Sequence, residues 1–234
     1  MRNAPEPGAA ARHRRRLSLS ETIAVRIVDS ESALENLIVE LAGISDYAID
    51  TEFHRERTYF AQLALVQLAW EGGVAVIDPL AADLAPLAQL FRGGATAVIH
   101  AADQDLEVLE RATGVAPTRM FDTQLAARFL GMSSPSLVSL AEKMLGIRLE
   151  KGDQLADWTR RPLGDEQLQY AAHDVAHLIA LKDAISEELV RQGRLSWAEE
   201  ECVALLERAR ALPPPEQAWW RLRQARQFRG TARG

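Results

Sequence analysis

The sequence predicts an α/β protein with one mixed sheet, flanked by helices and followed by a helical C-terminal extension. Short apolar runs typical of strands dominate the first half of the chain, and helical spacing fills the part from Asp165 to about Arg210. The strands do not alternate regularly with helices, as they would in a repeating parallel fold. With 234 residues and 47% apolar content, the chain can bury one substantial core but not two.

Five or six strands are expected in this sheet. They are residues 24–28, 47–53, 61–70, 74–78, 96–100 and 119–121. The second to fourth strands should form a meander, because Glu71-Gly72-Gly73 supplies a hairpin turn between the last two. Helices are expected at residues 33–41, 84–91, 102–112, 123–130, 137–145 and 165–210.

Both ends of the chain differ in composition from its middle. Residues 1–20 lack apolar periodicity and should be a disordered basic arm, and residues 21–207 should form the folded domain. Residues 208–234 contain Pro213-Pro-Pro215 and are expected to begin with a stiff linker. The remainder is too short to bury a core alone.

The net charge of −6 hides an uneven distribution. The stretches 1–16 and 208–234 together carry ten net positive charges, so residues 17–207 carry −16. This favours an acidic cleft neutralised by cations, with basic tails near phosphates, although a solvated surface with arginine-rich tails is an equal alternative. A single cysteine, Cys202, excludes a disulfide and a cysteine-rich zinc site. Without a signal peptide or membrane span, the chain is expected to be soluble and cytoplasmic.

Asp50 and Glu52 close the apolar run that begins at Tyr47. Strand alternation places both side chains on one face while Thr51 points away. With 33 acidic residues in the chain, a pair with this spacing can arise by chance. Two carboxylates at the end of an apolar strand are nevertheless costly unless a cation neutralises them, which favours a metal site.

Two further acidic positions can reach the same edge of the sheet. Asp105 lies one helical turn after the strand at residues 96–100, although Asp103 and Asp105 could simply be favourable N-terminal helix acids. Tyr170 and Asp174 are four residues apart and therefore share a helix face, although a packed tyrosine beside an exposed acid would give the same spacing. Jointly, four carboxylates suit two oxygen-liganded divalent ions, Mg²⁺ or Mn²⁺.

Four motifs in this order resemble the DEDDy family of 3′–5′ exonucleases, and ribonuclease D above all. The similarity runs from about Ala24 to Glu207. The motifs are Ile49-Asp-Thr-Glu52-Phe, Ile99-His-Ala-Ala-Asp-Gln-Asp105-Leu, Phe121-Asp-Thr-Gln-Leu-Ala-Ala127 and Tyr170-Ala-Ala-His-Asp174.

The resemblance implies a ribonuclease H-like sheet whose edge holds two divalent cations. The implied metal ligands and catalytic acids are Asp50, Glu52, Asp105 and Asp174. The two ions would hold the scissile phosphate, and one would activate a water. Tyr170 would orient or help deprotonate that water.

Six other positions are weaker candidates for substrate binding. Three of them, Phe53, Gln62 and His100, could touch the terminal nucleotide. The other three, Lys151, Arg160 and Arg161, could meet phosphates. Each also has an ordinary structural explanation, such as a core aromatic, a strand end or a solvated surface. Trp158 is expected to pack rather than to stack on a base.

The expected activity is metal-dependent trimming of RNA 3′ ends, by resemblance especially those of tRNA precursors, with no membrane and no obligate protein partner. The alternatives are a DNA-directed exonuclease of the same superfamily and a catalytically silent nucleic-acid-binding module. The family pattern includes C-terminal helical HRDC domains that help grip RNA. Here Glu216-Gln-Ala-Trp-Trp-Arg resembles only the beginning of such a domain.

Overall fold

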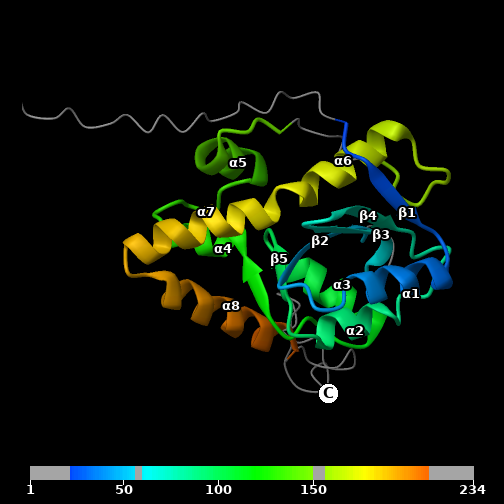
Figure 1. Ribbon diagram of the computed structural model, residues 1–234, viewed down its shortest axis with the longest axis horizontal. Coiled ribbons are helices and arrows are strands. Elements are labelled where there is room, and N and C mark those ends of the chain that lie inside the picture. Colours follow the sequence, from blue (N-terminus) through cyan, green and yellow to red (C-terminus); the bar gives the residue numbers. More distant parts are fainter. Residues whose placement is uncertain (1–21, 56–59, 150–155, 211–234) are drawn as a thin grey trace, which may run out of the picture.

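The computed structural model describes residues 22–55, 60–149 and 156–210. Within these ranges one six-stranded sheet carries helices on both faces (Figure 1). The strands are β1 (Val25–Val28), β2 (Asp46–His54), β3 (Gln62–Trp70), β4 (Gly73–Ile77), β5 (Thr96–Ile99) and β6 (Met120–Asp122). The helices are α1 (Glu31–Glu40), α2 (Leu87–Arg92), α3 (Asp103–Thr113), α4 (Thr123–Arg128), α5 (Leu137–Leu145), α6 (Asp165–Ala176), α7 (Leu178–Arg191) and α8 (Leu195–Arg210).

The strand order across the sheet is β1-β4-β3-β2-β5-β6. Strands β2, β3 and β4 form the expected antiparallel meander. The other three strands add in parallel, β1 to β4, β5 to β2 and β6 to β5. The sheet is therefore mixed, as the sequence predicts, and β2 and β4 end at the same edge.

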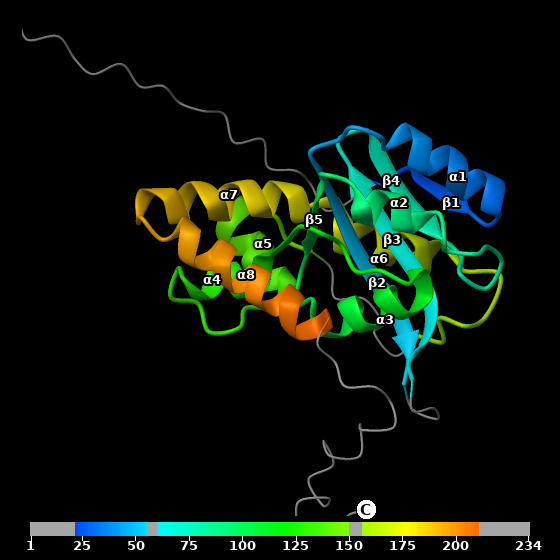
Figure 2. The ribbon, with the colours of Figure 1, turned by 90° about the horizontal axis from the view of Figure 1, so that it is seen from below.

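Alternation along β2 separates the two faces of the sheet. Tyr47 and Ile49 pack with α1, α2 and α3, whereas Ala48 packs with the helices of the opposite face. On that second face α6 lies across the meander, and its buried Ala171 and Ala172 permit a close approach. Figure 2 shows α4, α5, α7 and α8 grouped beside the β5 end of the sheet. Asp50 and Glu52 follow Ala48 at alternate positions and so face α6.

The pairing of β2 with β3 contains one irregularity that bears on the site. Glu52 lies opposite Leu65, and Phe53 lies opposite Leu63, so Ala64 is an extra residue in β3. This is a β-bulge, which bends the strand and changes the direction in which nearby side chains point. It lies directly beside Glu52.

The elements match the sequence expectation closely, with small shifts at their ends. Helix α5 has the predicted bounds, whereas α2 begins at Leu87 rather than at residue 84. The reason is that the turn before it bonds Leu87 to Leu84 and Ala88 to Ala85, a tighter pattern than an α-helix. The predicted N-terminal arm and residues 211–234 lie outside the described ranges. No helix in those ranges has the length and apolar character needed to cross a membrane.

Candidate active site

The C-terminal half of β2 brings Asp50 and Glu52 to the wall of a cavity of about 440 Å³. Both side chains remain partly exposed there, while the strand that carries them is buried on its other face by Tyr47 and Ile49. The expected placement on one face is thus confirmed by the sheet register. The strand therefore fixes the backbone positions from which the two carboxylates extend.

Asp105 reaches the same edge from the opposite face of the sheet. It lies in the first turn of α3 and is buried, whereas Asp103 is exposed. The Thr51 hydroxyl donates a hydrogen bond to the Asp105 carboxylate. Thr51 points away from Asp50, as alternation predicts, and this direction is what lets it hold Asp105.

Helix α6 supplies Tyr170 and Asp174 from above the sheet. Both side chains line the cavity, one helical turn apart on the same face. The Tyr170 phenol donates a hydrogen bond to the Asp174 carboxylate. The Tyr170 ring also packs against the indole of Trp158, with ring centroids 5.8 Å apart. Trp158 is buried, which confirms its expected packing role.

We call Asp50, Glu52, Asp105 and Asp174 the acid cluster. Burial raises the pKa of Asp50 well above its ordinary range, and the other three carboxylates add to the rise. Burial also raises the pKa of Glu52 to about 8, with further contributions from Asp174 and Asp105. The pKa values of Asp105 and Asp174 rise to about 6 through burial, opposed by the hydrogen bonds from Thr51 and Tyr170. The four acids therefore lack compensating positive charge.

This donor set fits a hard divalent cation, because carboxylate oxygens are the ligands such ions prefer and a cation would remove the mutual repulsion. Among the described residues no three potential ligands are already gathered at coordinating distance around one point. Asp105, Asp174 and Glu52 nevertheless each raise the pKa of Asp50, so the four carboxylates lie close enough to repel one another.

The cavity walls include residues from the sheet and from the helices that cover it. Two of the predicted nucleotide contacts, Phe53 and His100, line it. The His100 Nδ1 atom lies 2.9 Å from the Thr123 hydroxyl, and burial lowers the pKa of its imidazole, which favours the neutral form. Gln62 is exposed on β3 and does not line the cavity.

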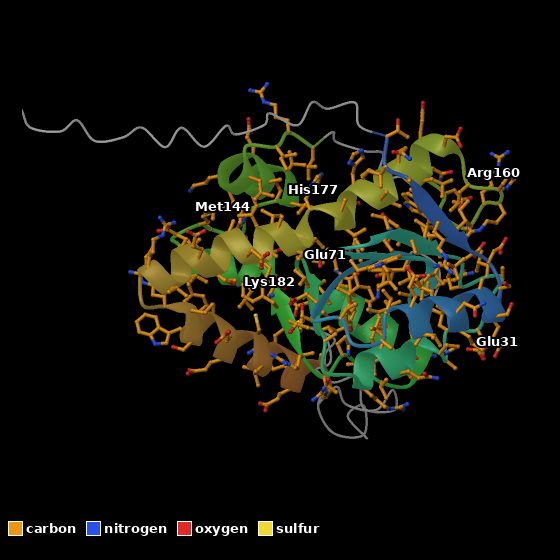
Figure 3. The ribbon with its side chains drawn as sticks, in the orientation of Figure 1. Glu31, Glu71, Met144, Arg160, His177 and Lys182 are labelled. Atoms are coloured by element: carbon orange, nitrogen blue, oxygen red, sulfur yellow. The ribbon has the colours of Figure 1, made fainter. Side chains whose placement is uncertain are left out.

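The three predicted phosphate contacts have different outcomes. Lys151 lies outside the described residues. Arg160 is exposed at the periphery of the molecule and away from the cavity lining (Figure 3). Arg161 is bound to Asp78 and to backbone carbonyls, so its guanidinium has a structural function and the predicted phosphate contact is replaced by these bonds within the protein.

Several residues of the site are not predicted from the sequence. The cavity wall opposite the acid cluster comes from Gln124 in α4 and from Ser136 and Leu137 at the start of α5. Leu178 closes the wall beside Asp174. These residues carry no charge pattern, and only the packing of α4 and α5 beside α6 brings them together.

Asp122 does not line the cavity, but it stabilises the backbone that positions the site. Its carboxylate caps α4 and accepts hydrogen bonds from the backbone N–H groups of Ala101 and Ala102, at 3.1 and 2.9 Å. Ala101 has a φ of 63°, which costs energy in a residue other than glycine. Asp122 thereby stabilises the turn that leads from His100 to Asp105. Asp122 is part of a motif that resembles the exonuclease family, but only the structure shows that it stabilises this turn.

Comparison with known proteins agrees with this geometry. A family model described as 3′–5′ exonuclease matches residues 25–190. Ribonuclease D of Acidiphilium cryptum is 40% identical over 201 residues, which are 84% of this chain and 51% of that protein.

Two solved structures extend the comparison to the fold. The structure of Escherichia coli RNase D, described as an exoribonuclease involved in structured RNA processing, has a TM-score of 0.82 and 35% identity, covering 88% of this chain and 56% of that chain. Brucella melitensis NrnC with bound Mg²⁺ has a TM-score of 0.69 and 25% identity, covering 85% of this chain and 96% of that chain.

The chain spans about half the length of the curated relatives it matches. The match nevertheless contains the whole sheet, the acid cluster and Tyr170. The mixed sheet with flanking helices is the ribonuclease H-like fold that the sequence predicts. The family depends on divalent metal ions, and the carboxylate donors of the acid cluster fit such an ion. Over the part of ribonuclease D that it matches, the chain is similar to that protein in sequence and fold, and it belongs to the 3′–5′ exonuclease family.

Proposed function

We propose that this chain is a metal-dependent 3′–5′ exoribonuclease that removes nucleotides one at a time from RNA 3′ ends. The observation that supports this most strongly is the acid cluster, of which Asp50, Glu52 and Asp174 meet Tyr170 at the wall of one cavity while the buried Asp105 adds its charge from behind them. An intact set of candidate ligands argues against a catalytically silent binding module.

The reaction is hydrolysis of the terminal phosphodiester. A water oxygen forms a new bond to phosphorus while the bond from phosphorus to the 3′ oxygen breaks, which leaves a 3′-hydroxyl on the RNA and releases a nucleoside 5′-monophosphate. Two bound divalent ions, Mg²⁺ or Mn²⁺, would stabilise the charge on the phosphate and lower the pKa of the attacking water. We propose that the four carboxylates of the acid cluster are the protein ligands of these ions.

Tyr170 would orient the attacking water by hydrogen bonding. Burial and the nearby Asp174 raise the pKa of its phenol above the ordinary range, so the hydroxyl keeps its proton at neutral pH. A protonated phenol that donates its hydrogen to Asp174 can still accept a hydrogen bond from water through its oxygen, but it does not remove a proton. This favours a positioning function for the hydroxyl over general-base catalysis.

The remaining walls of the cavity would hold the terminal nucleoside. Phe53, Leu137 and Leu178 offer apolar surface for the base, and His100, Gln124 and Ser136 offer polar atoms for the sugar. Similarity to ribonuclease D supports RNA as the substrate class. We propose tRNA precursors as its members and the cytoplasm as the place of action.

The test is digestion of matched RNA and DNA oligonucleotides labelled at the 5′ end, with Mg²⁺, with Mn²⁺ and with a chelator. We expect a ladder of RNA products shortened from the 3′ end, release of nucleoside 5′-monophosphates, and no products with chelator. DNA cleavage equal to or faster than RNA cleavage would favour the DNA-directed alternative. Matched 3′-extended and mature tRNA would then test the substrate class.

A further inference from the structure

We propose that Arg161 is a positioning residue of this active site, which holds Glu52 and Tyr170 in place by tying the segment before α6 to the β-bulge in β3. This role rests on the proposed function, because it is defined by the reaction that Glu52 and Tyr170 support. Arg161 lies outside the cavity lining, so any effect on the reaction must pass through other residues.

All five N–H donors of the Arg161 guanidinium are used within the protein. Nε donates to Asp78 Oδ2 at 2.5 Å, and Nη2 donates to Asp78 Oδ1 at 2.8 Å, which gives a two-pronged ion pair. Nη2 also donates to the Ala64 carbonyl at 2.7 Å. Nη1 donates to the carbonyls of Trp158 and Arg160, at 2.7 and 3.0 Å. No donor is left for a phosphate oxygen.

The contact with Ala64 links Arg161 to the strand beside Glu52. Ala64 is the extra residue of the bulge, so the sheet ladder does not pair it with a residue of β2. The residue is fully buried, and an unpaired buried carbonyl would cost on the order of 1–3 kcal/mol. Arg161 supplies the missing donor. It thereby stabilises the bulge, which lies opposite the step from Glu52 to Phe53.

The contact with Trp158 links Arg161 to Tyr170. With its carbonyl held by Arg161, the indole of Trp158 is only 2% exposed and packs against the Tyr170 ring at an interplanar angle of 32°. A displacement of Trp158 would therefore shift or loosen Tyr170. One guanidinium thus connects Asp78, which directly follows β4, with the bulge of β3 and the aromatic support of Tyr170.

A double-mutant cycle on the full chain separates this role from a phosphate contact. Arg161→Lys keeps the charge beside Asp78 but cannot make five hydrogen bonds. We expect kcat to fall on the order of tenfold to a hundredfold, since small misplacement at a reacting centre has effects of that size. We expect KM for RNA to change less than about twofold, since no substrate contact is lost.

In the Tyr170→Phe background, the same Arg161→Lys substitution should lower kcat by a smaller factor, because the hydroxyl of Tyr170 is already absent and only the effect through Glu52 remains. Arg26→Lys is the matched control, since Arg26 pairs with Glu40 on the exposed surface and neither residue lines the cavity. A raised KM with weaker salt dependence would show that Arg161 binds phosphate, and would overturn the proposal. An equal loss of kcat in both backgrounds would overturn the connection from Arg161 to Tyr170.

A second measurement does not depend on activity. The chain has three tyrosines, so ¹⁹F NMR of fluorotyrosine-labelled protein gives few signals, and Tyr170→Phe identifies that of Tyr170. We expect Arg161→Lys to shift or broaden this signal and Arg26→Lys to leave it unchanged. An unmoved signal would refute the positioning role even if the wild-type protein is active. If Arg161→Lys shifts the Tyr170 signal but the wild-type protein does not cleave RNA, the positioning role stands and the proposed function is contradicted.

Trp158→Phe provides a second variant in case Arg161→Lys does not fold. It keeps an aromatic ring but reduces the surface that supports Tyr170. We expect the same shift of the Tyr170 signal and the same loss of kcat at unchanged KM. Normal kcat and an unshifted signal in this variant would contradict the connection from Trp158 to Tyr170.

Discussion

The acid cluster and the Asp78–Arg161 pair lie at the same edge of the sheet, separated by β3, yet their electrostatics are opposite. Burial raises the pKa of Asp50 and of Glu52 because no cationic side chain compensates them. Burial would also raise the pKa of Asp78, but hydrogen bonds from Arg161 and the Leu80 N–H lower it overall. An ionised aspartate therefore stabilises the fold at position 78 and destabilises it at position 50. Uncompensated charge at the acid cluster is what a metal-dependent site requires.

The largest expected effect is on activity at the acid cluster. Asp50→Asn keeps the shape of the side chain but removes one ligand charge, and we expect a loss of turnover on the order of a thousandfold or more. Asp29→Asn, at an exposed position, is the control and should retain full activity. The measurement is single-turnover cleavage of a 3′-labelled RNA in excess Mn²⁺. Wild-type rates in Asp50→Asn would remove Asp50 from the site.

The second prediction concerns the pH dependence of stability without metal. The ordinary pKa values of Glu52, Asp105 and Asp174 are 4.5, 3.8 and 3.8, and those of the folded protein are about 8, 6 and 6. Between roughly pH 4 and 8 the folded state therefore binds more protons than the unfolded state, so the free energy of unfolding falls as pH rises.

Asp78 contributes in the opposite direction, because its pKa is lowered on folding. Its stabilisation is present above its ordinary pKa and is lost as pH falls toward the lowered value. Urea unfolding in chelator at about pH 5 and pH 8 tests the acid cluster, because the Asp78 contribution is fully present at both pH values. Higher stability at pH 8 would contradict the raised pKa values of the acid cluster.

The third prediction concerns the compensated pair. Asp78→Asn leaves the Arg161 guanidinium with a weaker partner, and the side chains of this pair are only 13% and 26% exposed. We expect the free energy of unfolding to fall by about 2 kcal/mol. Glu40→Gln is the matched control, because its pair with Arg26 is 50% and 40% exposed and should contribute less than about 0.5 kcal/mol. If Asp78→Asn and Glu40→Gln lower the free energy of unfolding in urea equally, burial does not make the Asp78–Arg161 pair more stabilising than an exposed pair.

The smallest expected effect concerns Gln67, which lies opposite Asp50 in the β2–β3 register and is fully buried. Within the part of the chain that the structure describes, neither amide atom of Gln67 has a hydrogen-bond partner. Gln67→Leu should therefore raise the free energy of unfolding by about 1 kcal/mol. A lower free energy of unfolding for Gln67→Leu than for the wild type, both measured in chelator, would show that the Gln67 amide is hydrogen-bonded in the native protein.

Sequence reasoning predicts the part of the site that follows from local periodicity. Strand alternation places Asp50 with Glu52, and helical spacing places Tyr170 with Asp174, because each pair lies within a single element. The choice of Asp105 over Asp103 comes from family resemblance, and the buried position of Asp105 agrees with it.

Contacts between distant segments are what the sequence does not predict. Arg161 has the charge of a phosphate contact, but its partner Asp78 is 83 residues away and its other acceptors are backbone carbonyls without a residue signature. The cavity wall formed by Gln124, Ser136 and Leu137 depends in the same way on how α4 and α5 pack.

The most direct test of the central claim is thermal unfolding of the wild-type protein and of Asp50→Asn, each in chelator and in Mn²⁺. If the charges of the acid cluster repel one another until a cation binds, removing one of them should stabilise the protein without metal. Asp50→Asn should then have a higher melting temperature than the wild type in chelator. Mn²⁺ at about a hundred times its dissociation constant should stabilise the wild type by about 2.7 kcal/mol and the variant much less. A lower melting temperature of Asp50→Asn in chelator, with equal stabilisation of both proteins by Mn²⁺, would contradict the account.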